Sequence, residues 1–465
     1  MKKFLWVICC VFVFCFVFGA SVVSKFKDIL GPDLVASFTL QGATAAETLS
    51  ADEFEKEIID VKYIKADGEV DTRQIVLYKP ANAQGDIPVI FVPHYAVNEN
   101  TADFVAYIKN GWAASSPYNV KNEYNGTLAT DDLVFNNAAL YTLRNMNGID
   151  KQRIAMVGGS AGGYMTLMLS QLHMGTVASI ANSPIANIYF NAHVYFPKSD
   201  EVNRNTGLFD FIMPVQGMIS KSFQPINDIL TNENDPLWEA LSPVSMAKAF
   251  SSPIVINHNT ADILVPIDQI TKKYTYEDND GTLPEGFNAS LDDNYPGILS
   301  SSLEELANQN EVSISKYVFE NNVVEGEMPY SEKLLTINVI DDGPISAKGS
   351  HVAPNTTGGY DSMPYLQDMM DKTLRNTEKL VPEKLLLLLD RYLGNSKQLP
   401  AHEGINDNVY GSLAIYQKEV ADELSTWVEN HSLEEMDSAM QEALSNSANK
   451  EQYTEVWNEI KAHIK

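Results

Sequence analysis

One stretch of the sequence indicates the fold most directly: Ile154-Ala155-Met156-Val157-Gly158-Gly159-Ser160-Ala161-Gly162-Gly163-Tyr164. Its first four residues predict a buried strand, and the apolar positions that follow it recur at helical spacing. Between them lies Gly-x-Ser-x-Gly, the pattern of a serine exposed on a sharp strand-to-helix turn. The pattern indicates Ser160 as a nucleophile and the backbone N–H of Ala161 as an oxyanion donor. A chance serine in a glycine-rich turn is the alternative, which the strand, the helix and the two extra glycines disfavour.

Short apolar runs alternate with helical patterns on both sides of this stretch. A helix with Leu133, Val134, Ala138 and Tyr141 on one face is predicted before it. Such alternation indicates an α/β fold, with a mostly parallel sheet covered by helices on both faces. The predicted strands are 75–78, 89–92, 111–114, 154–157, 177–180, 254–256 and 334–339.

Two segments interrupt the alternation, and a helical tail follows it. Residues 185–245, rich in aromatics and methionines, are predicted to form a cap. Residues 275–332 hold thirteen Asp or Glu and one basic residue, and are predicted to be a surface insertion or a lid. The catalytic domain is therefore expected at 55–394 and a helical C-terminal extension at 395–465. The extension is either an appendage docked on the body or a surface for an oligomer or partner.

The first twenty residues resemble a secretory signal peptide. Lys2 and Lys3 precede the apolar run 4–18, and small residues follow at 19–21. We therefore expect a secreted or extracytoplasmic protein. The alternative is that this segment is retained as a membrane anchor, the one case in which contact with a membrane is expected.

Composition restricts the partners and the chemistry. The net charge of −28 disfavours a nucleic-acid partner, because an acidic chain repels phosphate. All three cysteines lie in the N-terminal apolar run, which excludes thiol catalysis and a zinc–thiolate site. No His-Glu-x-x-His spacing or calcium-loop pattern is present, so neither a metal nor a cofactor is predicted.

A serine nucleophile requires a base and an orienting acid. Asp262 follows the strand 254–256 and is the best acid, with Asp268 as the weaker candidate. His351, in a glycine-containing loop after the last predicted strand, is the best base. Tyr95, in the loop after strand 89–92, is a candidate second oxyanion donor through its N–H or its hydroxyl. The other histidines fit the chain order less well: His94, His173, His193, His258, His402, His431 and His463.

The motifs resemble those of a known family. Residues 158–164, Gly-Gly-Ser-Ala-Gly-Gly-Tyr, resemble the nucleophile elbow of prolyl-oligopeptidase-like α/β hydrolases and related carboxylesterases. Residues 238–269 resemble the acid segment of the same family, although Asn259 replaces its usual glycine. The resemblance spans roughly residues 58–394 and implies the triad Ser160, Asp262 and His351.

Three functions remain open at this point. The first is an exported serine hydrolase that cleaves a small ester, or an amide, through an acyl-enzyme. The second is a dipeptidyl-type serine peptidase acting on short peptides. Because no β-propeller pattern precedes the catalytic domain, we expect an ester substrate rather than a peptide. The third is a non-catalytic binding protein on a hydrolase fold.

Overall fold

The structure is a computed structural model. It describes residues 47–65, 68–118, 128, 131–173, 176–188, 190–191, 241–262, 265–271, 306–320, 323–324, 333–341, 363–371, 382, 384–389, 419–424, 431–445, 447, 450–462 and 464. The predicted signal peptide, most of the predicted cap and His351 lie outside these residues.

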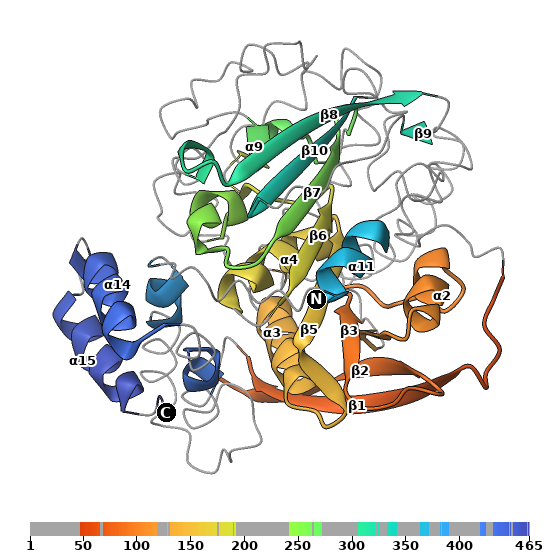
Figure 1. The fold of residues 1–465 in the computed structure, drawn as a ribbon, viewed down its shortest axis with the longest axis horizontal. Helices are drawn as coiled ribbons and strands as arrows, with labels where there is room; N and C mark the ends of the chain where they lie inside the picture. Colours follow the sequence, from red (N-terminus) through yellow and green to blue (C-terminus); the bar gives the residue numbers. More distant parts are fainter. Residues whose placement is uncertain are drawn as a thin grey trace, which may run out of the picture.

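A twisted ten-stranded sheet organises the described part of the chain (Figure 1). Its strand order is β1-β2-β4-β3-β5-β6-β7-β10-β8-β9. The strands from β4 to β8 in this order pair in parallel, whereas β1, β2 and β9 are joined antiparallel at the two edges. The bounds are β1 Phe54–Ile64, β2 Val70–Pro80, β3 Ile87–Phe91, β4 Ala113–Pro117, β5 Ile149–Gly159, β6 Ala178–Asn182, β7 Ile254–Asn259, β8 Val312–Glu320, β9 Val323–Val324 and β10 Leu335–Asp341.

Helices cover both faces of this sheet, as the α/β prediction requires. On one face, α3 (Asp131–Arg144) and α4 (Ala161–Leu172) pack on a core that includes Phe91 and Met156. On the other face, α2 (Ala102–Lys109) and α11 (Met363–Asp371) pack on a core that includes Ile90 and Val255. Central strands such as β3 and β6 are buried along their whole length, because both of their faces are covered.

Helix α3 is buried over more of its surface than its apolar pattern predicts. The predicted face residues Leu133, Val134 and Tyr141 are only partly buried. Polar residues such as Asn136 and Arg144 are buried instead. The reason is tertiary: α3 packs against the sheet and α4 and also contacts the C-terminal part of the chain.

Part of the predicted acidic insertion belongs to the sheet. Strand β8 runs parallel to β10 over seven residue pairs, so residues 312–320 extend the sheet. The rest of 275–332 lies largely outside the described residues. The boundaries of the cap, the insertion and the extension stay predictions.

The C-terminal residues form a second small core beside the sheet. Helices α14 (Leu433–Ser445) and α15 (Lys450–Lys461) pack against each other (Figure 1). Ser432 and Glu435 form a capping box at the start of α14, with reciprocal hydrogen bonds of 2.7 and 3.2 Å. Trp457 is fully buried in this core, and its indole N–H donates to Asp437 at 2.6 Å. Leu385, Leu388 and Leu389 join this core, although they precede the expected boundary at 394.

Further short helical elements are the 3₁₀ helix η2 (Pro243–Ala249), α9 (Asp268–Thr271) and the helical segments 384–389 and 419–424. Among the described residues, no helix has the length and apolar character needed to cross a membrane.

Candidate active site

Ser160 lies at the turn between β5 and α4, in a backbone conformation that residues other than glycine rarely adopt. Its φ is 52° and its ψ is −117°. Strain of this kind costs on the order of 1–3 kcal/mol and persists only where the surrounding structure enforces it. Here the Ser160 N–H donates to the carbonyl of Asn182 at 2.9 Å, and the Ser160 carbonyl accepts from the N–H of Tyr164 at 2.9 Å. The turn is therefore held by β6 on one side and by the first turn of α4 on the other.

The glycines around Ser160 are required by close backbone approach. A Cβ on Gly158 would lie 2.3 Å from the carbonyl oxygen of Gly162, and one on Gly163 would lie 2.9 Å from Cβ of Pro184. A Cβ on Gly162 would lie 3.0 Å from the carbonyl oxygen of Pro93. These contacts explain physically why the sequence pattern predicts this turn.

Tyr95, in the loop after β3, lies beside the turn at Ser160. A Cβ on Gly162 would lie 3.1 Å from Cδ2 of the Tyr95 ring. The Tyr95 N–H, however, donates to the carbonyl of Pro93 at 2.9 Å, in a tight turn centred on His94, whose φ is 72°. The N–H of Tyr95 is therefore engaged within its own loop. The N–H of Ala161 is in the first turn of α4, where amides have no acceptor within the helix.

A buried polar group holds this loop in place. The His94 N–H donates to Oδ1 of Asn136 at 2.9 Å, and His94 Nδ1 lies 3.7 Å from Oδ2 of Asp132. Arg73 donates to Oδ1 of the same carboxylate at 2.5 Å. Burial lowers the pKa of His94 to about 4, although the Asp132 carboxylate opposes this shift. His94 is therefore a neutral imidazole at pH 7.

Asp262 is fully buried in the loop that follows β7, where the sequence placed the acid. Its Oδ1 accepts from the N–H of Val265 at 3.0 Å. His258 lies beside it, with Nε2 3.6 Å from Asp262 Oδ2 and 2.6 Å from the carbonyl oxygen of Val265. His258 thus braces the acid loop. Asp268, the weaker acid candidate, is buried in the first turn of α9.

His351 lies outside the described residues, so its meeting with the other two stays a prediction. The strand before its loop is described: β10 pairs with β7 in parallel, in register from Leu335–Ile254 to Ile340–Asn259. The loops after β5, β7 and β10 therefore all leave the same edge of the sheet.

The comparison with family models agrees with this geometry. Residues 75–275, which include the turn at Ser160 and the loop of Asp262, match the model of the family BD-FAE, a family of α/β hydrolases. This part of the chain is an α/β-hydrolase domain.

Solved structures similar to the chain are hydrolases at low identity. Acylaminoacyl peptidase from Pyrococcus horikoshii is 13% identical with a TM-score of 0.41, over 68% of this chain and 42% of its own. A puromycin-hydrolyzing peptidase from Mycobacterium tuberculosis is 18% identical with a TM-score of 0.34, over 48% of this chain and 34% of its own. Prolyl oligopeptidase B from Galerina marginata is 14% identical with a TM-score of 0.35, over 48% and 31%. The chain thus spans less than half of each. No curated protein sequence matches it.

A row of buried amides crosses the hydrolase sheet beneath the nucleophile turn. Asn338 on β10 donates to Oδ1 of Asn257 on β7 at 2.9 Å, and Asn257 donates to Oδ1 of Asn182 on β6 at 2.8 Å. All three side chains are at most 7% exposed. Because the carbonyl of Asn182 also accepts the N–H of Ser160, the row links the turn at Ser160 to β7 and β10.

Gln269 makes a second network, between the acid loop and the start of the predicted cap. Its Oε1 accepts from the N–H of Ala186 at 2.8 Å and from Nδ2 of Asn191 at 2.9 Å. Its Nε2 donates to the carbonyl of Pro184 at 2.9 Å, next to Gly163. The sequence patterns did not predict the roles of Gln269, the asparagine row and the Arg73–Asp132–His94 group. Asparagines at the carboxyl ends of three predicted strands were the available signal.

The contact around Gly158 predicts a large loss of stability for Gly158→Ala. The new methyl group would force the backbone of α4 away from β5, and overpacking of this kind costs typically 1–3 kcal/mol or more. Gly111→Asn is the control, because Gly111 has φ +79° and nothing within 4 Å of its Cβ position, and asparagine tolerates this conformation. Urea unfolding should show a loss of at least ~2 kcal/mol for the first and less than ~1 kcal/mol for the second. Equal losses of unfolding free energy in the two variants would show that the turn at Ser160 is not tightly packed.

The buried neutral state of His94 predicts a dependence of stability on pH. Its folded pKa of about 4 lies below the ordinary value of 6.5, so between these values the unfolded chain binds a proton that the folded chain does not. The contribution of His94 is therefore complete above pH 6.5 and declines as pH falls to about 4. In His94→Gln, the slope of unfolding free energy against pH should be shallower in this window. An unchanged slope in His94→Gln would contradict the assignment.

Proposed function

We propose that the chain is an exported serine hydrolase that cleaves a carboxylic ester through an acyl-enzyme at Ser160. The observation that carries the proposal is the backbone of Ser160, held at φ 52° and ψ −117° between β5 and α4. A strained serine at this point of an α/β-hydrolase sheet is presented at the carboxyl edge, beside the free amides of a helix N-terminus.

In this mechanism His351 accepts the proton of the Ser160 hydroxyl while its oxygen attacks the ester carbonyl. The resulting oxyanion accepts hydrogen bonds from the N–H of Ala161 and the hydroxyl of Tyr95. The protonated His351 then donates its proton to the leaving alcohol as the bond to the acyl carbon breaks. Water, deprotonated by His351, attacks the acyl-enzyme, releases the acid and restores the serine.

Asp262 keeps the imidazole of His351 in the required tautomer and stabilises its positive charge. One oxygen of Asp262 is already fixed by the N–H of Val265, which sets the orientation of the carboxylate. The parallel pairing of β7 and β10 supports this role, because the chain leaves both strands at the same edge of the sheet, ahead of Asp262 and of His351.

The second oxyanion donor is assigned to the hydroxyl of Tyr95. The sequence left undecided whether the N–H or the hydroxyl of Tyr95 is the donor. Because the N–H donates to the carbonyl of Pro93, the hydroxyl is the group proposed here. The tyrosine ring lies against Gly162, one residue after Ala161, so the two donors flank the same turn.

Export rests on the N-terminal sequence pattern, with the signal peptide removed near residue 20. Mass spectrometry of the protein recovered outside a secreting cell gives the mature N-terminus. An intact residue 1 on a membrane-bound protein would indicate an anchor instead.

Ser160→Ala is expected to abolish labelling by a fluorophosphonate probe and to lower ester turnover by more than ~10⁴-fold. Ser179→Ala, at a buried position on β6, is the control and should keep both the probe labelling and the ester turnover of the wild type. Labelling that survives in Ser160→Ala contradicts the assignment of Ser160 as the nucleophile.

A panel of short acyl esters and Xaa-Pro amides then separates an esterase from a dipeptidyl-type peptidase. Biological activity that persists without Ser160 would indicate a binding protein.

Tyr95→Phe should lower kcat by about 10²–10³-fold with little change in KM, because the lost hydrogen bond stabilises the oxyanion of the transition state. Tyr107→Phe, a buried tyrosine on α2, is the matched control and should leave kcat unchanged. Steady-state kinetics on the best ester of the panel measures both. A Tyr95→Phe enzyme with normal kcat would remove the hydroxyl from the oxyanion site.

A further inference from the structure

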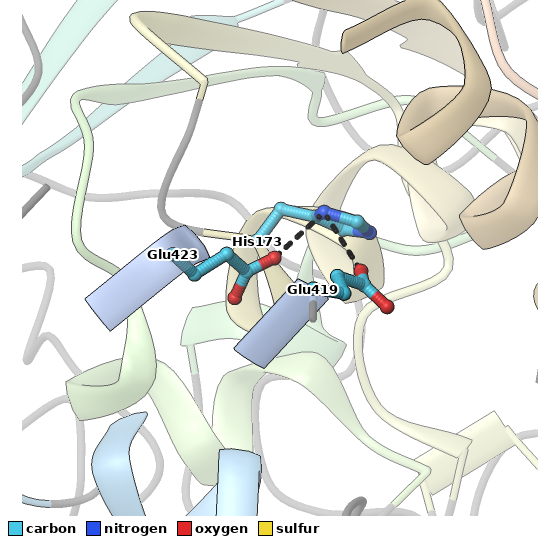
Figure 2. Close-up of side chains that lie close together, drawn as sticks. All are labelled: His173, Glu419 and Glu423. Atoms are coloured by element: carbon cyan, nitrogen blue, oxygen red, sulfur yellow. Dashed lines mark ion pairs between the residues drawn. The ribbon is translucent and has the colours of Figure 1, made fainter. Parts of the chain in front are cut away.

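A buried group of ionisable side chains joins the C-terminal extension to the hydrolase domain. His173 caps the C-terminal end of α4, while Glu419 and Glu423 belong to the helical segment 419–424 (Figure 2). All three side chains are at most 1% exposed. Nδ1 of His173 lies 3.1 Å from Oε1 of Glu423 and 3.6 Å from Oε1 of Glu419, so the carboxylates flank one imidazole nitrogen.

The other nitrogen of His173 fixes the state of the ring. Nε2 forms a short hydrogen bond with Oδ1 of Asn137 on α3, so Nε2 carries a proton. Nδ1 then faces the carboxylates with a lone pair unless a positive charge lies there. A lone pair beside carboxylate oxygens is repulsive, and the cost is high where water is excluded. The position therefore requires positive charge beside Nδ1, which a proton, a metal ion or the guanidinium of Arg144 can supply.

Arg144 supplies part of the positive charge. Its Nη1 lies 3.2 Å from Oε1 of Glu423 and 3.4 Å from Nδ1 of His173. With a neutral imidazole, the two carboxylates and the guanidinium carry a net charge of −1 (−2 from the glutamates, +1 from Arg144). Arg144 can stay as an outer donor to Glu423 when a cation is bound to its carboxylate, which is the usual arrangement around metal ligands.

We propose that His173, Glu419 and Glu423 bind a divalent transition-metal ion of the zinc class. Three candidate ligand atoms, one from each side chain, lie within 4.8 Å of one another. Two ligand atoms bound tetrahedrally to zinc lie about 3.3 Å apart, and the distances of 3.1 and 3.6 Å from Nδ1 lie on either side of this value. The hydrogen bond from His173 Nε2 to Asn137 is the outer contact that metal-binding histidines usually make. Water would take the fourth position.

The ion would fasten the extension rather than take part in the proposed hydrolysis. Ser160 precedes the first residue of α4 and His173 follows its last, so the two lie about 20 Å apart along the helix. The ligands come from positions 173, 419 and 423, and they join α4 to a segment almost 250 residues later in the chain. The inference does not depend on the proposed function, because its test measures metal binding and stability.

The test is a zinc titration of the purified full chain after treatment with a chelator. We expect one zinc ion per chain by calorimetry, with a higher melting temperature. Glu419→Gln should weaken binding by more than ~100-fold while it preserves the contacts of Glu423 with Arg144 and His173, and Asn137→Ala should weaken it by about 10–100-fold. Glu442→Gln, on the exposed face of α14, is the control and should bind zinc like the wild type.

Two results would overturn the proposal. One is the absence of stoichiometric zinc binding together with a melting temperature that falls as pH rises, which would show a proton at Nδ1 instead. The other is binding of equal strength in Glu419→Gln. Should that variant fail to fold, zinc-edge X-ray absorption on the wild-type complex decides the case. One imidazole with oxygen ligands supports the site, whereas several imidazoles or a thiolate refute it.

Discussion

The close approach of α4 to the end of β5 is the constraint on which the rest of the hydrolase domain depends. With Gly158 and Gly162 in van der Waals contact through their backbones, the chain must reverse from strand to helix within one residue, and that residue is Ser160. The strain at Ser160 is offset by packing that the glycines make possible and by hydrogen bonds on both sides of the turn.

Polar networks inside the sheet extend this constraint to neighbouring strands. The row of Asn182, Asn257 and Asn338 fixes the relative height of β6, β7 and β10 by amide hydrogen bonds that no apolar side chain could supply. On the other side of the turn, His94 and Asp132 hold the loop that places Tyr95 against α4. Buried amides and charges are costly unless they are paired, so their position at one edge of the sheet indicates that this edge is built for precise placement of side chains.

The C-terminal extension is tied to the domain by interactions of a different kind. Its own core is apolar and includes Trp457, but its contacts with α3 and α4 include buried charges. Lys384, just ahead of the expected extension, adds to them by donating to the carbonyl of Ser170, two residues before the end of α4. Contacts of this kind fix one docked arrangement, because a shifted helix would leave a charge buried and unpaired.

The sequence by itself determined the local parts of this protein. Strands, helices, the Ser160 turn and the Ser432–Glu435 capping box follow from residues close together in the chain, whose pattern directly reports their local conformation. It also predicted that Asp262 follows a strand at 254–256, and β7 covers these residues. Tertiary structure decided the rest: which face of α3 is buried, that residues 312–320 join the sheet, and that Tyr95 uses its N–H locally. The meeting of His173 with Glu419 and Glu423 is of the same kind, because partners separated by 246 residues leave no periodic signal in the sequence.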